Sequence, residues 1–296
     1  AASDVYKRQG ARVGIEPFGG FKLSGTGPKA GGKVYIPAFH IHRHSLSIQS
    51  LPEENGFNER VDLAIRSGLS PSMRVERLEQ ALGLILLNFE TLFKGISGTD
   101  KRLVQKFNKW ISRNALEYIS KDHMNRTIPG QLSFSNIEIQ GEHALAIMGT
   151  AVPHISTFLQ VAAALLMGTG VTIVCRNRQA YDWWQAVLNY YQQAGVSREN
   201  VSVYFPSNDT YQALLREEYV SYYILDGDEG WMKETLKKIY HQDYTEKRVK
   251  NVYTPFDTFN PTDFKRLCGN YVWVRAFAVN TMRHGAPLDL DLDVEI

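Results

Sequence analysis

The feature that most constrains this chain is a change of apolar rhythm near residue 143. From there, short apolar runs alternate with segments of helical period. We predict strands at Ala144–Met148, Val171–Val174, Val201–Phe205, Val220–Leu225, Val249–Tyr253 and Val272–Val279, and helices at Ile155–Leu166, Ala180–Ala194, Thr210–Arg216 and Trp231–Tyr240. Apolar strands that alternate with helices are typical of a parallel sheet covered on both faces. The fold class we predict is α/β, with a doubly wound domain in this stretch.

The segment before this change has a helical rhythm instead. We predict a short helix at Glu59–Ser67 and longer helices at Met73–Phe93 and Thr99–His123, because their apolar residues recur every three to four positions. Ser72 is the candidate cap of the second helix, and Thr99 or Asp100 of the third. The polar stretch Leu51–Asn58 precedes them and predicts a linker.

Composition excludes several classes of protein. Hydrophobic residues make up 44% of the chain, which is typical of a globular protein, and no run approaches the roughly 18–20 apolar residues that a membrane-spanning helix needs. The net charge is +2, and the basic residues are scattered along the sequence rather than gathered into a stripe. We therefore expect no nucleic-acid partner. The two cysteines are too few for a disulfide framework and suit a reducing compartment.

A glycine-rich block near the start carries the most specific signal. Pro17-Phe18-Gly19-Gly20 is followed by Ser24-Gly25-Thr26-Gly27 and continues to Gly32. The spacing meets neither the Walker nor the dinucleotide pattern. The block from Gly10 to Gly32 resembles the end of the catalytic domain of Δ1-pyrroline-5-carboxylate (L-glutamate γ-semialdehyde) dehydrogenases, in the aldehyde dehydrogenase superfamily. Its continuation from Thr26 resembles the proline utilisation A proteins.

Weaker resemblances run through the rest of the chain. Asn125–Met148, Ala162–Val174 and Val274–Thr281 resemble parts of the extra C-terminal domain of the longer family members, which is a degenerate aldehyde dehydrogenase-like fold. Two places depart from the family pattern. Phe21-Lys22 follows the general superfamily pattern, and the closing strand runs into Met282–Pro287 rather than the usual tail.

The resemblance implies a division into domains. Residues 1–9 resemble translated sequencing-adapter sequence, so we expect them to be a non-native leader and the natural protein to extend upstream. Residues 10–48 would end the aldehyde dehydrogenase domain. Residues 49–296 would form a non-catalytic aldehyde dehydrogenase-like domain. Within it we expect a helical part at 59–125, an α/β part at 126–270, and a closing strand and tail at 271–296 that act as a lid or assembly element.

The resemblance also assigns substrate-binding residues. It implies that the loop at Gly10 and Ala11 binds the carboxylate of the substrate through backbone N–H groups, since small residues let the backbone approach closely. Phe18 would pack on the aliphatic stem of the substrate. Without the resemblance, the same residues read as turn glycines and a core aromatic.

No catalytic residue is expected within this chain. Family members use an activated cysteine thiolate, but neither Cys175 nor Cys268 lies in the sequence context of the family nucleophile. We expect both to be buried or partly buried. The nucleophile, the general-base glutamate and the main NAD-binding domain are expected upstream, so the fragment alone should be inactive.

The function implied for the parent is NAD-dependent oxidation of L-glutamate γ-semialdehyde to glutamate in proline catabolism. FAD is expected only if a proline dehydrogenase domain lies upstream. The expected partners are the small-molecule substrate, the upstream catalytic domain and further copies in a homo-oligomer. The expected location is the bacterial cytoplasm, with peripheral membrane association of the parent as one option. Two alternatives stay open: a non-catalytic structural or ligand-binding module, and a generic aldehyde dehydrogenase with another substrate.

Three further patterns are candidate sites. Arg176-Asn177 follows a predicted strand at the position where aldehyde dehydrogenases contact adenine ribose, so a nucleotide site is one hypothesis and a nucleotide fold kept only for packing is the other. His40, His42 and His44 share one strand face, which suits either a metal or a solvated surface, and we favour the surface. Asp289, Asp291 and Asp293 alternate with leucines and predict an edge strand or flap rather than a calcium loop.

Overall fold

The computed structural model describes residues 48–94, 98–120, 123–124, 131–139, 141–217, 219–240, 251–255, 264–280, 282–283 and 286–287. The chain divides into two compact units. The first consists of Ala1–His40, Lys121–Glu138 and Trp273–Ile296, and the second of Ile41–Ser120 and Ile139–Val272. Each unit is described separately.

The described part of the first unit is built from β-strands. β1 (His123–Met124) pairs antiparallel with β2 (Gln131–Ile139), and β8 (Val272–Asn280) lies on the other side of β2. A second pair joins β9 (Met282–Arg283) to β10 (Ala286–Pro287) in antiparallel register. The sequence predicted β8 but missed β2, because its alternation is interrupted by polar Ser135 and Asn136.

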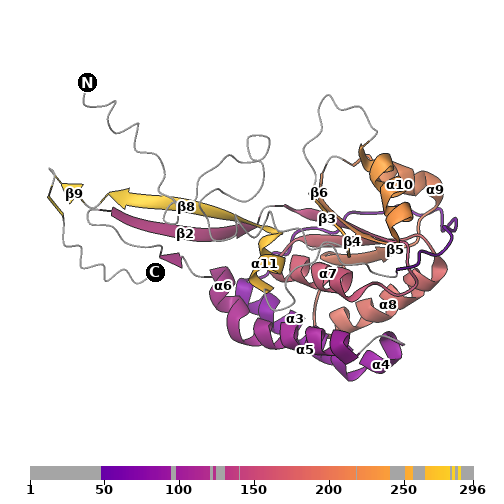
Figure 1. Cartoon of the computed structure of the whole chain (residues 1–296), viewed down its shortest axis with the longest axis horizontal. Helices are drawn as coiled ribbons and strands as arrows, with labels where there is room; N and C mark the ends of the chain where they lie inside the picture. The colour runs from indigo at the N-terminus through magenta and orange to yellow at the C-terminus, as the bar shows by residue number, and fades with distance from the viewer. Residues whose placement is uncertain are drawn as a thin grey trace. The chain divides into compact units, whose positions relative to one another are not determined.

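The second unit is organised around a five-stranded parallel sheet (Figure 1). Its strands, in spatial order, are β5 (Val201–Tyr204), β4 (Gly170–Cys175), β3 (His143–Met148), β6 (Val220–Asp226) and β7 (Asn251–Tyr253). Every neighbouring pair is parallel. The three central strands are almost continuously apolar because both faces of the sheet are covered.

Helices cover the two faces of this sheet. α7 (Ile155–Met167) and α8 (Arg178–Gln193) pack against the central strands on one face. The other face carries an apolar cluster that includes side chains of α9 (Asn208–Leu214) and α10 (Glu229–Tyr240). All residues of α7 are buried, since it lies between the sheet and further helices. The predicted α/β class with a doubly wound sheet is confirmed.

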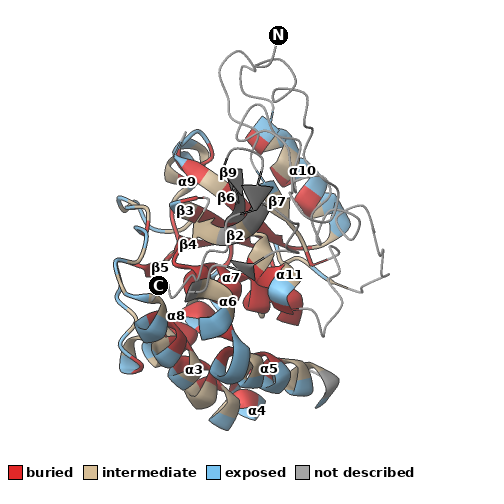
Figure 2. Ribbon diagram, turned by 90° about the vertical axis from the view of Figure 1, so that its left-hand side faces the viewer, coloured by how far each residue is buried: buried red, intermediate tan, exposed pale blue. Residues whose placement is uncertain are grey.

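An outer helical layer packs on α7 and α8. It contains α3 (Pro71–Leu87), α4 (Phe89–Leu92), α5 (Gly98–Trp110), a π-helical turn η2 (Ile111–Ala115) and α6 (Leu116–Ser120), while the short α11 (Phe264–Gly269) also packs on α7. Figure 2 shows the pattern of burial, with exposed residues on the outward side of α3 and α5. The helical period of the sequence is explained by this one-sided burial.

Three predictions in the helical region were wrong in detail. Glu59–Ser67 is not a helix: it is extended, and Val61 and Leu63 alternate inward onto the apolar cluster. Ser70, rather than Ser72, caps α3, because its hydroxyl accepts the N–H of Met73. The helix predicted at Thr99–His123 starts at Gly98, is interrupted by η2 and ends at Ser120.

Candidate functional site

The substrate-binding residues predicted from sequence, Gly10, Ala11 and Phe18, lie outside the described residues, as do His40, His42 and His44 and the aspartates of the tail. Their roles stay predictions. Among the described residues no group of histidine, cysteine or acidic side chains has the arrangement of a metal site. In the same part of the chain, no helix is long and apolar enough to cross a membrane.

The two cysteines are buried and free, as the sequence predicted. Cys175 ends β4, and Cys268 lies in α11; both side chains are completely inaccessible to solvent. Burial raises the pKa of each thiol far above its usual value. A protonated, inaccessible thiol is a poor nucleophile, so neither residue has the properties of a catalytic cysteine.

The strand order identifies the carboxyl edge of the sheet as the position where a nucleotide site is expected in this class of fold. The connections from β3 and β6 run in opposite directions across the sheet, which makes the gap between their carboxyl ends the topological switch point. Residues that follow these two strands would line a ligand crevice there. These residues are Gly149 and Thr150 after β3, and Asp226 and Gly227 at the end of β6.

A carboxylate of the chain itself lies at this switch point. Asp226 is fully buried, and its Oδ2 accepts hydrogen bonds from Thr150 Oγ1 at 3.1 Å and from the backbone N–H of His154 at 2.9 Å. His154 is the N-cap of α7, so the carboxylate lies at the positive end of that helix. A bound phosphate would need the same N–H groups.

Burial sets the protonation of this pair of residues. Burial raises the pKa of Asp226 to about 7, and its hydrogen bonds with His154 and Thr150 only partly oppose this. Burial lowers the pKa of His154 below its usual value. The ring of His154 caps α7, since Nδ1 lies 3.3 Å from the N–H of Ser156. Asp226 and His154 therefore both form hydrogen bonds with the amino end of α7.

Trp231 fills the space above the switch point. A Cβ atom added to Gly149 would lie 2.7 Å from the indole, and one added to Gly227 would also collide with it. The indole N–H donates to Glu53 Oε1 at 3.0 Å. The two glycines are thus needed to accommodate the indole of Trp231, which occupies the place that a ligand would take.

A segment of chain closes the rest of the edge. We call Ser50–Phe57 the strap. Its backbone N–H groups donate to the carbonyls that follow three strands: Leu51 to Gly149, Glu54 to Arg176 and Phe57 to Phe205, at 2.9, 2.8 and 2.7 Å. The strap therefore runs across the carboxyl ends of β3, β4 and β5, where the sequence predicted only a polar linker.

Arg176 and Asn177, the candidate ribose contacts, are used internally. Arg176 is buried, donates from Nη2 to Glu53 at 3.2 Å and to Asn208 at 2.6 Å, and lies 4.0 Å from the ring centre of Tyr211. Asn177 caps α8 and donates to the carbonyl of Gly149. Both side chains are buried, so the residues present at this edge do not fit a dinucleotide, although Nε and Nη1 of Arg176 have no hydrogen-bond partner among the described residues.

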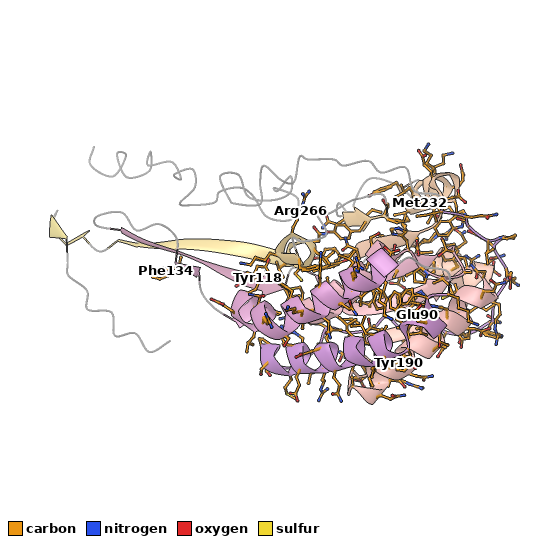
Figure 3. All side chains as sticks on the ribbon, turned by 60° about the horizontal axis from the view of Figure 1, so that its bottom comes forward. Glu90, Tyr118, Phe134, Tyr190, Met232 and Arg266 are labelled. Carbon is orange, nitrogen blue, oxygen red and sulfur yellow. The ribbon has the colours of Figure 1, made fainter. Side chains whose placement is uncertain are left out.

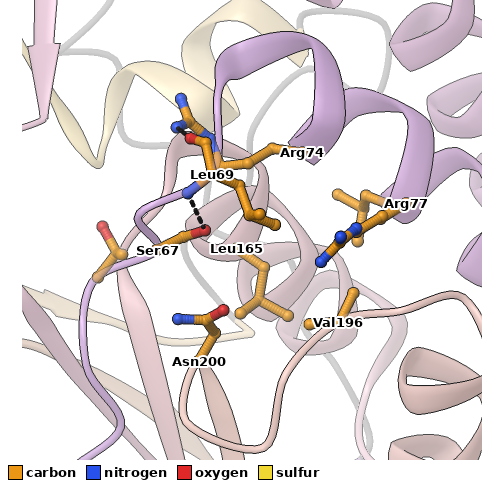
Figure 4. A pocket seen from close by; sticks show the side chains of 9 residues that line it. Ser67, Leu69, Arg74, Arg77, Leu165, Val196 and Asn200 are labelled. Atoms are coloured by element: carbon orange, nitrogen blue, oxygen red, sulfur yellow. Dashed lines mark hydrogen bonds between the residues drawn. The ribbon is translucent and has the colours of Figure 1, made fainter.

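The opposite, amino edge of the sheet has a small hollow (Figure 4). Two arginines of α3 line it. Arg74 is buried and donates to the carbonyls of Leu166 and Leu69 at 3.1 and 2.8 Å, and Arg77 donates to the carbonyl of Gly195 at 2.6 Å. The carbonyls of Leu166 and Gly195 lie at the carboxyl ends of α7 and α8, so the arginines complement the negative ends of both helices.

No protein-family model matches the chain. Over 60 residues it is 40% identical to the bifunctional protein PutA of Salmonella typhimurium, which covers 20% of this chain and 4% of that protein. Over 27 residues it is 70% identical to the bifunctional protein PutA of Rhizobium meliloti, which covers 9% of this chain and 2% of that protein. The matches thus span only a few per cent of these relatives' length.

Solved structures with a related arrangement include an indole-3-acetaldehyde dehydrogenase complexed with NAD⁺, which aligns over 63% of this chain and 38% of its own with a TM-score of 0.48 and 16% identity. A mutant of Bradyrhizobium japonicum proline utilization A aligns over 64% and 20%, with a TM-score of 0.48 and 15% identity. These likenesses are too distant to add to the argument. The sequence matches show that short segments of this chain are similar to bifunctional PutA proteins.

Proposed function

We propose that this chain is part of an NAD-dependent dehydrogenase that oxidises L-glutamate γ-semialdehyde to glutamate in proline catabolism. The 70% identity to a PutA protein over 27 residues and the resemblance of Gly10–Gly32 to the same family support this. In the proposal, Gly10 and Ala11 bind the carboxylate of the substrate and Phe18 packs on its stem. NAD is held by a domain upstream, and FAD belongs to the parent only if a proline dehydrogenase domain is also present.

The α/β unit has a non-catalytic role in this proposal. The observation that carries it is the closed carboxyl edge, where Asp226, Trp231 and the strap fill the position of a nucleotide. A fold of this class without its ligand crevice is suited to packing, as a lid or an assembly element. In this proposal the parent protein is a homo-oligomer in the cytoplasm, with peripheral association with the membrane as one option.

The test is an assay of the full-length parent for NAD reduction with L-glutamate γ-semialdehyde, compared with a truncation after Ile48. Activity that falls at least tenfold on truncation supports the lid role, since water exclusion and retention of the substrate would be lost (an order of magnitude typical of a displaced active-site element). Undiminished activity in the truncated enzyme would contradict the lid. Absence of activity with this aldehyde, but turnover of another, would replace the substrate assignment by a generic aldehyde dehydrogenase.

The second candidate is a purely structural or ligand-binding module. The closed carboxyl edge favours the structural module over the ligand-binding one. A nucleotide titration distinguishes these two alternatives. The 296-residue chain should show no saturable NAD binding by calorimetry. Saturable binding that is abolished by a bulky substitution at Gly149 would instead locate a nucleotide at the carboxyl edge.

A further inference from the structure

The strap contains the only Asn-Gly pair of the sequence, Asn55-Gly56. Both residues lie outside any helix or strand, and Asn55 is exposed. The side chain of an asparagine can react with the backbone nitrogen of the next residue where the two can approach each other. Glycine hinders that approach least, because it has no Cβ atom. The pair therefore combines the residue types and the exposure that intramolecular loss of the amide group requires.

The side chain of Asn55 is held in an orientation that favours this reaction. Its Oδ1 accepts the backbone N–H of Asn208 at 2.9 Å. Because an N–H can donate to the amide oxygen but not to the amide nitrogen, this bond fixes which atom is Oδ1. A donor at about 2.7–3.1 Å also stabilises the negative charge that develops on a carbonyl oxygen under attack. Nδ2, the group that would leave, donates to no residue that the structure describes.

The attacking nitrogen is also available. The N–H groups on either side of it are bonded, since Glu54 donates to Arg176 and Phe57 donates to Phe205, at 2.8 and 2.7 Å. The N–H of Gly56 lies between them and donates to no described residue. Attack by this nitrogen on the side chain of the preceding residue therefore breaks no hydrogen bond of the described chain.

We propose that Asn55 deamidates through the backbone nitrogen of Gly56, and that the isoaspartate formed releases the strap from the carboxyl edge of the sheet. The nitrogen of Gly56 attacks Cγ of Asn55 and closes a succinimide ring. The bond between Cγ and Nδ2 breaks, and Nδ2 leaves as ammonia with the proton of the Gly56 N–H. Water then opens the ring at either carbonyl. One opening gives aspartate, and the other gives isoaspartate, whose main chain is longer by the side-chain methylene carbon.

The two products have different consequences, because the strap has no room for another main-chain atom at Gly56. A Cβ atom added there would overlap the carbonyl of Phe205 and lie 2.8 Å from that of Pro206. The longer main chain of isoaspartate displaces Gly56 and Phe57 against these carbonyls, so the hydrogen bond of Phe57 is lost. Aspartate leaves the main chain unchanged, and its carboxylate can still accept the N–H of Asn208.

Release of the strap would open the closed carboxyl edge. Glu53 lies two residues before the reacting asparagine, and it accepts from the indole of Trp231 at 3.0 Å and from Arg176 at 3.2 Å. Figure 3 draws the side chains of this unit and labels Met232 on α10, the residue after Trp231. Loss of the strap frees these two side chains, so the modification is an irreversible opening that needs water and no cofactor.

The first test is incubation of the 296-residue chain at mildly alkaline pH, followed by tandem mass spectrometry. Asn55 should gain one mass unit and yield both aspartate and isoaspartate. Asn58 should keep its mass, although it is also exposed, because Glu59 rather than glycine follows it. Asn55→Gln should show no gain while half of the native chain reacts, since its longer side chain does not form the succinimide. Unchanged mass at Asn55, under conditions in which a free peptide of the same sequence reacts, would overturn the site.

The second test is hydrogen exchange at the backbone N–H groups of Glu54 and Phe57. In the isoaspartyl chain, separated by chromatography, both should exchange at least about tenfold faster than in the native chain, as expected for a locally opened segment. The matched control is Asn55→Asp, which carries the same charge on a main chain of native length and should exchange as the native chain does. Equal exchange in the isoaspartyl and native chains, or equally fast exchange in Asn55→Asp, would overturn the release of the strap. Neither test involves NAD or an aldehyde, so its outcome is independent of the proposed reaction.

Discussion

The two edges of the central sheet differ in the sign of the charged side chains that lie at the helix ends. At the carboxyl edge the positive ends of α7 and α10 meet carboxylates, because Asp226 binds the N–H of His154 and Asp228 binds the N–H of Trp231. At the amino edge the negative ends of α7 and α8 meet the guanidinium groups of Arg74 and Arg77. In both places the chain supplies the charge that a ligand or solvent would otherwise supply.

The difference between the edges lies in how they are covered. The carboxyl edge is closed by the strap and by Trp231, whereas the amino edge is bordered by α3 and keeps a small hollow. Since ligands of doubly wound sheets bind at the carboxyl edge, closure there removes the site that the fold normally offers. In the proposed non-catalytic role, this fold serves packing, since its own side chains fill the crevice.

The largest effect is expected at Asp226. Its pKa is about 7 in the folded chain and near 4 when unfolded, so the native state binds more protons between these values, and its contribution to stability is full below pH 4 and lost as the pH rises to 7. Across that window the loss amounts to about 4 kcal/mol. Asp226→Asn should remove this pH dependence. The free energy of unfolding of the variant, relative to that of the native chain, should therefore be higher at pH 8 than at pH 5.

Urea unfolding at pH 5 and pH 8 measures this difference. If the native chain and the variant show the same change of unfolding free energy between the two pH values, Asp226 is not the titrating group, and the carboxyl edge is not closed by a buried acid. His154 has the opposite effect on the pH dependence. Because burial lowers its pKa, the free energy of unfolding decreases as the pH falls below the usual pKa of a histidine. His154→Gln therefore serves as the comparison.

The next effect concerns the strap. Glu53→Ala leaves the buried guanidinium of Arg176 without its anion, and we expect a loss of about 3 kcal/mol of unfolding free energy. The double variant Glu53→Ala/Arg176→Met should recover part of this, because no buried charge is left unpaired. Tryptophan fluorescence should also change in the single variant, since Glu53 accepts from Trp231. Additive losses in the double variant would show that the two side chains act independently.

A smaller effect is expected at the amino edge. Arg74→Met keeps an apolar stem but leaves the carbonyls of Leu166 and Leu69 without donors, which should cost about 2 kcal/mol. Arg77→Met should cost about 0.5 kcal/mol, because Gly195 accepts its bond in a solvent-exposed place where water can replace the donor. Thermal unfolding of both variants tests this, and equal costs would mean that burial does not distinguish the two arginines.

The last prediction concerns the start of α3, the helix that carries both arginines. Ser70→Ala removes the cap of Met73 and should cost about 1 kcal/mol, while Ser72→Ala should change little. The two variants differ only in position along the same turn. The reverse order in their unfolding midpoints would restore Ser72 as the cap that the sequence predicted.

Much of the fold could be read from the sequence. The strands at Ala144–Met148 and Val171–Val174 and the helix at Ile155–Leu166 agree with β3, β4 and α7 to within a few residues, since apolar periodicity reports burial directly. The segment Glu59–Ser67 was misread as a helix because its neighbours in space, not its own period, determine its conformation. Its backbone N–H groups bond to Thr172, Glu199 and Gly168.

The candidate site shows the same limit. Asp226 and Trp231 have no local signal that distinguishes them from a surface aspartate and a helical tryptophan, and Glu53 lies in what reads as a linker. The only usable hint was Gly149 and Gly227 after two apolar strands, since a glycine at such a position allows close approach of another group.

The sequence by itself determined the parallel α/β class, the burial of both cysteines and the resemblance to PutA at Gly10–Gly32, because these depend on local period, residue type and motif. Only the tertiary structure decided that the carboxyl edge is closed and that Glu59–Ser67 is extended rather than helical. Closure depends on contacts between residues far apart in sequence, such as Glu53 and Arg176. The extended conformation of Glu59–Ser67 likewise depends on distant partners, since its backbone N–H groups bond to Thr172, Glu199 and Gly168.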